Sequence, residues 1–553
     1  MVPLRAGGRA GTEGDVAWPK GCGSVVRTTG DGLTERYDAI VIGSGHNGLI
    51  AAAYLARAGR RVLVLERREV IGGATVTEEI WPGYRLSTCS YVCNLLLPEV
   101  IRDLNLKRHG YDVRPFDPQH FVPFPDGRYL MSFLDEGKTK AQISRFSERD
   151  VAAHDAYWAM WDRIIARMRP LLTRPAPTQM DIERAFDGPQ GEEDWRTLTE
   201  KSIAEVLDGF FESEEVKAPL CVGGVIGTNA GPRTPGTAYV KYHHIIGNLD
   251  GHQGAWGFVR GGMGAVAHAI ASSAKKHGAE IITDAEVAKI EIEDGAARGV
   301  HLPDGRSFEA DAILSNADPH RMYLGMVGEE HLPDELVEGL GQMQIKGSVV
   351  KVLLALNELP DFTALPGKEV GPQHTGAIVI NPSVDYLQKA WEDCEQGHPS
   401  EKPFMEGYIQ SATEDGLAPE GKHTMSLFCQ YAPYDLSGGT WEEIGANIIE
   451  TFAEYAPNLP NAIEHIEVLG PPDVEERIGI TGGNIFHGEI LPDQMFKGRP
   501  VPGYAGYRTP VGNLYLCGSG AWPGGAVFGA PGRNCALEVL ADLEARTLVG
   551  HTT

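Results

Sequence analysis

The sequence predicts an α/β protein whose parallel main sheet is assembled from distant segments of the chain, together with a second domain of the α+β type. Two observations lead to this expectation. Residues 37–65 follow the order strand, glycine turn, helix, strand, and both strands are short apolar runs rich in β-branched residues, typical of a buried parallel sheet. Much later, residues 513–533 repeat the order of strand, glycines and helix, which indicates a return to the same domain.

The first glycine turn carries the pattern of a Rossmann-type dinucleotide-binding domain. Gly43, Gly45 and Gly48 are spaced G-x-G-x-x-G. The first glycine allows the tight turn, the second lets a pyrophosphate approach the backbone, and the third lets the helix pack on the strand. Glu66 closes the second strand, where an acidic side chain accepts hydrogen bonds from an adenosine ribose. A glycine-rich turn in another kind of α/β unit would leave Glu66 unexplained.

A second glycine pair narrows the choice of dinucleotide. Gly72 and Gly73 follow the acidic residue in the run E-R-R-E-V-I-G-G, a spacing typical of the FAD form of the motif rather than the NAD form. Glu66 also leaves no place for a 2′-phosphate, so we do not expect NADP to bind tightly at this turn.

The same stretch resembles a known family. IGSGHNGLIAAAYLARAG and VLERREVIGGATVTEEIWPGYRLSTCSYV resemble the phytoene dehydrogenase-related flavoproteins, a group of carotenoid desaturases, desaturase-like β-carotene ketolases and retinol saturase. The resemblance covers nearly everything after Tyr37, and it implies FAD as the cofactor. Motif and resemblance together predict an FAD site made of Gly43, Ser44, Gly45, Asn47, Gly48, Glu66, Arg67, Gly72, Gly73, Ala74, Val287, Gly518, Ser519, Gly529 and Ala530.

The length of 553 residues is too great for one ordinary core, so we expect two interleaved domains. The FAD-binding domain is expected in three separated segments, at residues 37–105, 255–345 and 476–553. The substrate domain, an α+β unit with a mixed or antiparallel sheet and a helical insertion, is expected at residues 106–254 and 346–475.

Residues 1–36 are expected to form a disordered or mis-started tail. They have no apolar periodicity and no apolar core of a secretory signal. Their acidic residues nearly balance their basic ones, which is not typical of a mitochondrial presequence. We therefore expect a cytoplasmic protein, with the mitochondrial matrix, which the resemblance implies for animal relatives, as the alternative.

The other elements follow from periodicity and turn residues, taken in order. Asp126-Gly127 marks a hairpin within residues 110–134, and residues 148–207 have a helical pattern. Residues 279–314 contain strands joined by hairpin turns. From residue 346 the apolar and polar residues alternate, as in a sheet with one wet and one dry face, and residues 441–455 form a helix.

The second glycine stretch, after the strand at residues 513–517, precedes a helix that we expect from Arg533 onward. A helix N-terminus that follows glycines is an anion site. In the family that the chain resembles, this site holds the ribityl-pyrophosphate and directs the helix dipole at the flavin. A glycine-rich surface loop is the alternative, but the strand and the helix on either side argue against it.

The composition excludes several classes of function. The net charge of −26 opposes binding to nucleic acid or to an anionic membrane through general electrostatics, although a local apolar patch that contacts a membrane stays open. No apolar run is long enough to span a bilayer. The eight cysteines form no C-x-x-C and no zinc-type spacing, so we expect reduced thiols, no metal and no redox dithiol.

The expected reaction is a hydride transfer between flavin N5 and an apolar substrate of polyene or lipid type, in a desaturation or dehydrogenation. His487, in GGNIFHGEILPDQMF, is the candidate for a proton relay, with orientation of the cofactor as the equal alternative. Tyr239, His243 and Asn484 are the candidate substrate-binding residues. A flavin amine oxidase-like enzyme acting on a smaller substrate and a non-catalytic FAD-binding protein are the alternatives. The electron acceptor (quinone, oxygen or nicotinamide) and the oligomeric state stay open.

Overall fold

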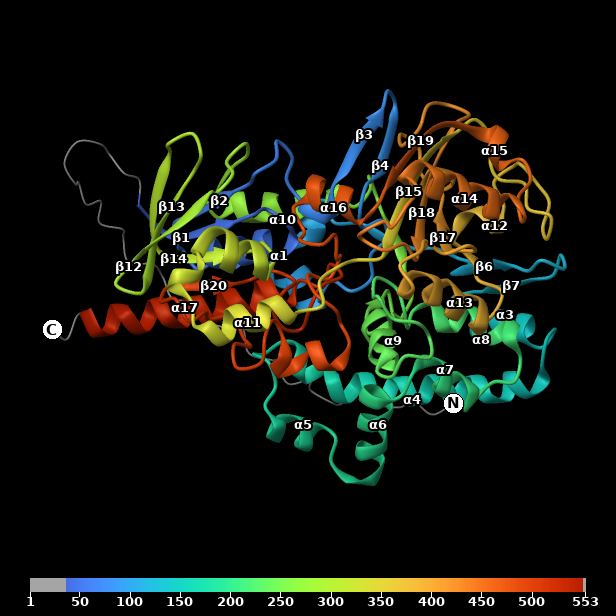
Figure 1. Ribbon diagram of the computed structural model, residues 1–553, viewed down its shortest axis with the longest axis horizontal. Helices are drawn as coiled ribbons and strands as arrows, with labels where there is room; N and C mark the ends of the chain where they lie inside the picture. The colour runs from blue at the N-terminus through green and yellow to red at the C-terminus, as the bar shows by residue number, and fades with distance from the viewer. Residues whose placement is uncertain (1–35, 551–553) are drawn as a thin grey trace, which may run out of the picture.

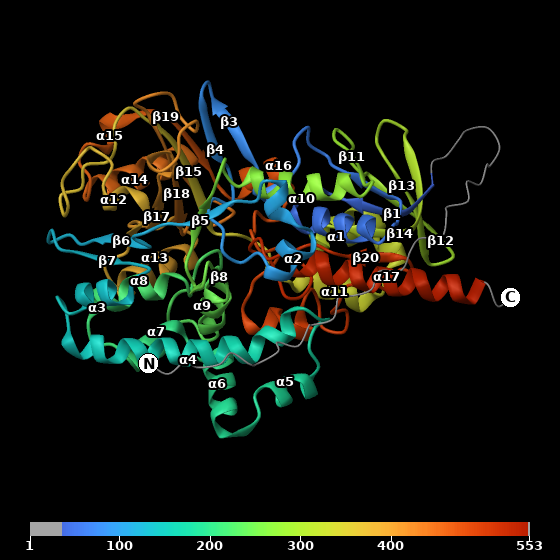
Figure 2. The ribbon, with the colours of Figure 1, turned by 180° about the vertical axis from the view of Figure 1, so that it is seen from behind.

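The computed structural model describes residues 36–550, and the tail expected at residues 1–36 lies almost wholly outside the described residues. Two sheets lie side by side, one toward the chain's C-terminal end and one on the opposite side, and a group of helices lies beneath the second sheet (Figure 1). The same arrangement is visible from behind (Figure 2).

The first sheet is the Rossmann-type sheet, with the strand order β11-β2-β1-β14-β13-β12 and with β20 paired to β14. Five strands pair in parallel, whereas β12 and β13 form an antiparallel extension. The strands are β1 (Arg36–Ile42), β2 (Val62–Leu65), β11 (Glu280–Ile282), β12 (Lys289–Glu293), β13 (Ala296–His301), β14 (Ser307–Ser315) and β20 (Leu514–Leu516). The parallel sheet therefore takes its strands from three distant parts of the chain, and the predicted α/β fold class is confirmed.

Three helices contact one another on this sheet: α1 (His46–Arg57), α10 (Gly264–Lys276) and α17 (Ala530–Gly550), with α1 against both of the others. The predicted helix at residues 49–58 begins three residues earlier, because the extended backbone of Gly45 (φ −59°, ψ 161°) already serves as its N-cap. The last helix likewise begins before Arg533, directly after Gly529, whose φ of +79° turns the chain into it.

The second sheet has the order β19-β15-β18-β17-β16-β6-β7 and is antiparallel except for the parallel pair of β16 and β6, as expected for a mixed sheet. Its strands are β6 (His120–Pro123), β7 (Tyr129–Ser132), β15 (Val349–Leu356), β16 (Ala377–Ile380), β17 (Phe404–Tyr408), β18 (His423–Gln430) and β19 (Ile463–Leu469). The Asp126-Gly127 turn joins β6 to β7, with Gly127 at a φ of +82°.

The helical insertion lies between β7 and β10 in the chain. Side-chain caps fix its helix starts: Ser147 accepts a hydrogen bond from the Asp150 amide, and the Ser202–Glu205 pair forms a capping box. Helices α5 and α6 project below the rest of the molecule (Figure 1). The helices are α3 (Glu136–Ile143), α4 (Glu148–Leu172), α5 (Gln179–Ala185), α6 (Gly188–Glu200), α7 (Ile203–Asp208), α8 (Glu214–Val222) and α9 (Thr237–Ile245).

Shorter elements connect these layers. They are β3 (Thr77–Trp81), β4 (Tyr84–Ser87), α2 (Pro98–Asp103), β5 (Val113–Pro115), β8 (Asn248–Leu249), β9 (His252–Gln253), β10 (Gly257–Val259), a π-helical segment (Arg321–Val327), α11 (Asp334–Gln342), α12 (Pro372–Thr375), α13 (Val384–Glu395), α14 (Trp441–Ala453), α15 (Leu459–Ala462) and α16 (Pro471–Ile478).

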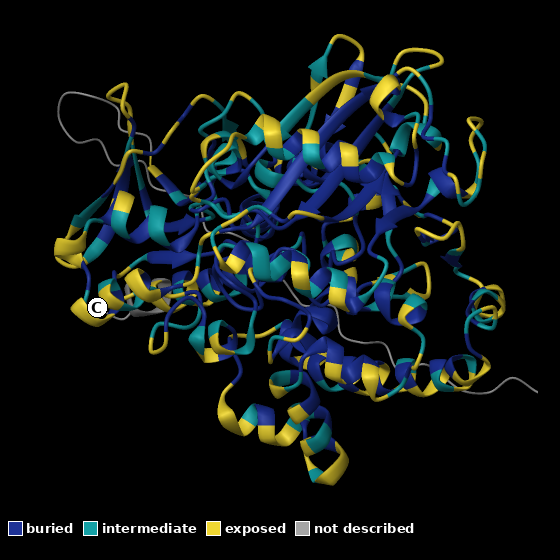
Figure 3. Ribbon diagram, turned by 45° about the vertical axis from the view of Figure 1, so that its right-hand side comes forward, coloured by how far each residue is buried: buried dark blue, intermediate teal, exposed yellow. Residues whose placement is uncertain are grey.

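The buried residues lie mainly in and around the two sheets. Most strands of both sheets are buried, and exposed residues gather on the projecting helices and the outer turns (Figure 3). Among the described residues, no helix is both long and apolar enough to cross a membrane. The seven cysteines within residues 36–550 are free thiols, and Cys22 lies outside the described residues.

One buried arginine joins the closing loop of the chain to the last strand of the first sheet. Arg499 is fully buried, and its guanidinium donates to the carbonyl oxygens of Ser519 (2.8 Å), Glu489 (2.9 Å) and Phe486. Each of these carbonyls lies inside the protein, where a missing donor leaves the acceptor unsatisfied.

We expect Arg499→Met to lower the free energy of unfolding by about 3 kcal/mol or more, since three buried carbonyl groups lose a charged donor. Urea unfolding followed by circular dichroism measures the change. The exposed Arg298→Met is the control and should stay within about 0.5 kcal/mol of the unaltered protein. Equal stabilities of the two variants would contradict this role.

Candidate active site

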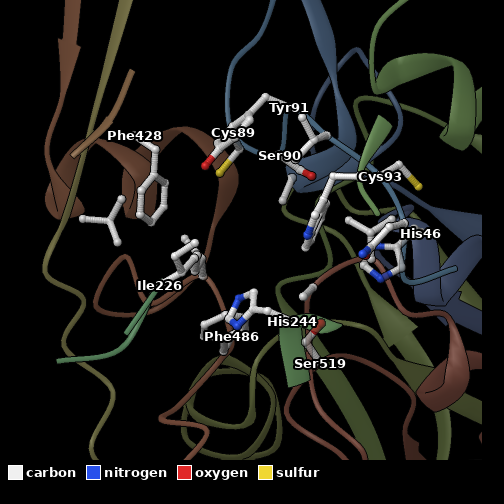
Figure 4. Close-up of a pocket in the computed structure, with 18 of the residues that line it drawn as sticks. His46, Cys89, Ser90, Tyr91, Cys93, Ile226, His244, Phe428, Phe486 and Ser519 are labelled. Carbon is white, nitrogen blue, oxygen red and sulfur yellow. The ribbon is translucent and has the colours of Figure 1, made fainter. Parts of the chain in front are cut away.

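A cavity of about 970 Å³ extends from the glycine turn of the first sheet to the inner face of the second sheet. Figure 4 shows its two ends: His46 and Ser519 lie at the side of the first sheet, and Phe428 and Ile226 lie at the side of the second. We call the first end the cofactor cradle and the second end, between β15, β17 and β18 on one side and α8 and α9 on the other, the substrate arm.

Glu66 holds the glycine turn in the cradle. Its carboxylate accepts hydrogen bonds from the Ser44 amide (2.8 Å), the Ser44 hydroxyl (2.6 Å) and the Arg68 amide (2.9 Å). Glu66 is 6 % exposed and lines the cavity, so the carboxylate still faces the space that a ribose would fill. Glu66 directly follows β2, which a short loop connects to α1.

The N-terminus of α1 offers unpaired donors to an anion. The N-cap residue Gly45 has no side chain that could cap the helix, and it lines the cavity. A Cβ atom on Gly48 would collide with the carbonyl oxygen of Gly43, so the close contact between turn and helix requires glycine. The Gly48 amide donates to Oδ1 of Asn316 at 3.1 Å, which ties the turn to the end of β14.

The second glycine stretch meets the first in space. Nδ2 of Asn47 donates to the Ser519 hydroxyl at 3.4 Å, and Oδ1 of Asn47 accepts from the Gly532 amide at 3.4 Å. Ser519, Ala526 and Val527 line the cavity. The uncapped helix, the ribose-facing carboxylate and these converging turns fit an FAD molecule, whose adenosine, pyrophosphate and flavin parts need such partners.

The predicted cofactor residues divide into two groups. Those that line the cavity are Gly43, Gly45, Glu66, Arg67, Gly73, Ala74, Val287 and Ser519. Those that lie behind the lining and shape it are Ser44, Asn47, Gly48, Gly72, Gly518, Gly529 and Ala530. The roles of individual residues at the cofactor stay predictions.

His487 also lines the cavity. Its backbone has a φ of +60°, its side chain is half-buried, and the buried Nδ1 atom finds no hydrogen-bond partner among the described residues. Burial lowers the pKa of His487 to about 4, while the nearby Asp318 carboxylate acts in the opposite direction. The imidazole is therefore neutral near pH 7 and suited to accept a proton rather than to donate one, and its catalytic role stays a prediction.

The three candidate substrate-binding residues lie outside the cavity lining, which corrects their expected position. His243 directs Nε2 to the carbonyl oxygen of Gly525 (3.2 Å), and Tyr239 packs against Phe496. Asn484 orders its own loop: Nδ2 donates to Glu489 (3.2 Å), and Oδ1 accepts from the Phe486 amide (3.0 Å). The helical phase of α9 turns the next residue, His244, toward the cavity instead.

Three charged residues of the substrate arm were not anticipated from the sequence: Lys241, Lys351 and Glu406. Their side chains are almost entirely buried, with exposed fractions of 6 %, 4 % and 5 %. The available signal was a lysine within the apolar strand run SVVKVLLAL and a glutamate within PFMEGY. Charged residues inside a buried strand are uncommon unless they serve a site.

Comparison with known proteins finds one matching family and several relatives that span most of the chain. The model of the family "Flavin containing amine oxidoreductase" matches residues 48–422. The chain is 41 % identical over 550 residues to the mouse pyridine nucleotide-disulfide oxidoreductase domain-containing protein 2, with 93 % of this chain and 94 % of the mouse protein covered. It is 27 % identical to a limonene dehydrogenase component of Castellaniella defragrans (92 % and 95 % covered) and 24 % identical to the lycopene-forming phytoene desaturase of Pantoea ananas (89 % and 96 %).

A solved structure supports the fold alone. The cyclohexylamine oxidase of Brevibacterium oxydans superposes with a TM-score of 0.57 at 19 % identity, covering 92 % of this chain and 99 % of that one. The expected resemblance to phytoene dehydrogenase-related flavoproteins and the FAD cofactor are both confirmed by these relatives.

We expect Glu66→Gln to weaken FAD binding by about tenfold to a hundredfold, because a carboxylate that accepts three hydrogen bonds and faces the ribose becomes a poorer acceptor. Titration of the apoprotein with FAD, followed by quenching of flavin fluorescence, measures the dissociation constant. Glu69→Gln, on an exposed neighbour, is the matched control. Unchanged affinity of the Glu66→Gln variant at unchanged thermal stability would refute the assignment of Glu66 to the ribose.

Proposed function

We propose, for a chain that belongs to the flavin containing amine oxidoreductase family, that this FAD-dependent oxidoreductase takes a hydride from a largely apolar substrate of polyene or lipid type. The reaction would be a dehydrogenation or desaturation. The single observation that carries this proposal is the substrate arm, a roomy continuation of the cofactor cradle with mainly apolar walls.

The walls of the arm suit a long apolar molecule. Toward the helical insertion they consist mainly of aliphatic and aromatic side chains from β7, α3, α4, α8 and the residues next to them, and several of these side chains are half-exposed at the outer end, where Glu136 and Asp162 also lie. They are Leu130, Phe133, Leu134, Ile143, Trp158, Pro219, Leu220, Val222 and Ile226. Contact with such walls is favourable in proportion to the apolar area that leaves water.

When bound, FAD supplies the hydride acceptor. The residues of this chain position the substrate and exclude water: Phe486, Trp256 and Phe428 surround the space between cradle and arm with apolar surface. His487 lines the cavity with a neutral ring, and we assign to it the uptake of the proton that a dehydrogenation releases.

The relatives point in two directions. Limonene, phytoene and lycopene appear in the names of two of them, which supports an apolar substrate. The family name and the cyclohexylamine oxidase structure favour an amine as the second candidate. Two buried lysines in the arm oppose a cationic amine, and a complete cradle joined to an open arm opposes a non-catalytic role. We retain the cytoplasm as the proposed location, on the sequence grounds given above.

We expect the purified protein to show oxidised flavin bands that bleach, in the absence of oxygen, on addition of an apolar alkene from a panel of terpenes, carotenoids and unsaturated lipids. Amines should leave the bands unchanged. Bleaching by an amine instead would overturn the assignment of an apolar substrate. Absence of flavin bands after incubation with FAD would overturn the assignment of the protein as a flavin-dependent enzyme. NAD⁺, NADP⁺, quinones and oxygen, added in turn to the substrate-reduced sample, identify the electron acceptor by the return of the oxidised flavin bands.

We expect Ile226→Trp to abolish this bleaching by substrate while FAD stays bound, because the larger ring would fill the arm into which Ile226 points (Figure 4). The ratio of flavin to protein absorbance checks that the cradle is intact. Ile466→Trp, at a position of β19 that is 45 % exposed, controls for the added volume. Full bleaching in the Ile226→Trp variant would place the substrate elsewhere.

A further inference from the structure

We propose that the apolar substrate ends in a carboxylate, and that this carboxylate binds between Lys241 and Lys351 in the substrate arm. The inference rests on the proposed function, because it names the chemical class of the molecule that enters the same cavity. It depends on where three buried charges lie relative to one another and on the partners that they lack.

The first lysine belongs to a row of residues across the second sheet. Lys351 of β15 pairs with Phe428 of β18, and Phe428 pairs on its other side with Glu406 of β17. All three line the cavity, so their side chains share the face that points into the arm. Since neighbouring strands lie about 4.8 Å apart, the backbones of Lys351 and Glu406 are roughly 10 Å apart with the Phe428 ring between them.

The second lysine approaches from the opposite wall. Lys241 lies on α9, and its Nζ passes 3.2 Å from the point where a Cβ atom on Gly223 would lie. Gly223 also lines the cavity, so the absence of a side chain there gives the lysine its path along the wall.

Neither ammonium group is in direct contact with a carboxylate of the described residues, although Glu406 acts on both at longer range. In the part of the chain that the structure describes, no ion pair joins Lys241 or Lys351 to a carboxylate, and Nζ of Lys351 has no hydrogen-bond partner. Lys351 does lie 3.3 Å from the centroid of the Tyr91 ring, a cation–π contact that stabilises the charge without pairing it. Glu406 instead accepts a hydrogen bond from the Tyr408 hydroxyl at 3.1 Å.

The balance of charge among the three buried groups is therefore positive, and the other carboxylates of the arm, Glu136 and Asp162, are exposed to solvent at its outer end. Two ammonium groups face one carboxylate, and burial lowers the pKa values of the neighbouring His120 and His244 to about 4, so both rings are neutral near pH 7. Burial also lowers the pKa of Lys351 to about 7 and that of Lys241 to about 8, and it raises that of Glu406 to about 7. A buried charge without a partner is unfavourable, and an added anion removes the excess.

The remainder of the arm fits the other part of such a molecule. The outer end toward α3, α4 and α8 is mainly apolar, apart from the exposed Glu136 and Asp162, whereas the three buried charges lie on the sheet and on α9. A carboxylic acid with a long apolar body matches this division, while a cationic amine would meet two ammonium groups. We therefore assign the site to an apolar acid.

The test compares three ligands with the same ten-carbon chain, decanoate, decanol and decylamine, titrated into the FAD-loaded protein by calorimetry at pH 7. Decanoate should bind at least about tenfold more tightly than the other two. Lys241→Met and Lys351→Met should each weaken decanoate about tenfold or more and leave decanol unchanged. Lys346→Met, an exposed lysine just before the same strand, is the matched control and should have no effect.

A variant that removes the negative charge of Glu406 distinguishes an effect on ligand binding from damage to the folded site. Glu406→Gln removes the only opposing charge among the three, so it should strengthen decanoate binding, which a merely damaged site cannot do. Equal affinity for the three ligands, tighter binding of decylamine, or weaker decanoate binding by the Glu406→Gln variant would overturn the carboxylate site. Because the titration needs only intact flavin bands, such a result stays distinct from failure of the proposed reaction, which the bleaching assay alone reports.

Discussion

The parallel pairing of β1 with both β2 and β14 is the constraint on which the rest of the structure depends. Parallel neighbours bring their carboxyl ends to one edge of a sheet. Here that edge receives the glycine turn after β1, Glu66 after β2 and Asn316 after β14. The hydrogen bonds from Gly43 to the Leu65 carbonyl (2.8 Å) and from Asn316 to the Ile42 carbonyl (2.8 Å) continue the pairing to its last residue. Every feature of the cradle is fixed relative to that edge.

The sequence alone was sufficient to predict the cofactor cradle, because the residues that indicate it lie close together in the chain. A glycine spacing, an acidic residue at a strand end and a second glycine pair lie within about thirty residues, and each has a steric or electrostatic reason for its place. The assembly of the first sheet from separated segments could also be predicted from the sequence, since a strand, glycines and a helix near the C-terminus repeat the first pattern. Both helix starts lie a few residues earlier than expected, because the extended Gly45 and the left-handed Gly529 already turn the chain into the helix.

The lining of the substrate arm could not be predicted in the same way, because it depends on the rotation of helix α9 about its axis and on the register between strands of the second sheet. Tyr239, His243 and His244 lie on one short helix, and only the packing of α9 decides that His244 rather than His243 faces the cavity. Lys351 and Glu406 are 55 positions apart and become neighbours only through the shared partner Phe428 on the strand between them. No local pattern encodes such a cross-strand row. The arm thus combines mainly apolar walls with a few buried charges.

The three-segment sheet has a consequence for how the protein is made. During synthesis β1 and α1 leave the ribosome several hundred residues before β20 and α17, which complete their sheet and cover α1. The intervening chain contains the whole second domain, so that domain can collapse while the first still lacks a strand. Contacts so distant in sequence form slowly. The binding surface for FAD is therefore complete only after β20 and α17 have been synthesised, and until then the N-terminal strands lack part of their cover.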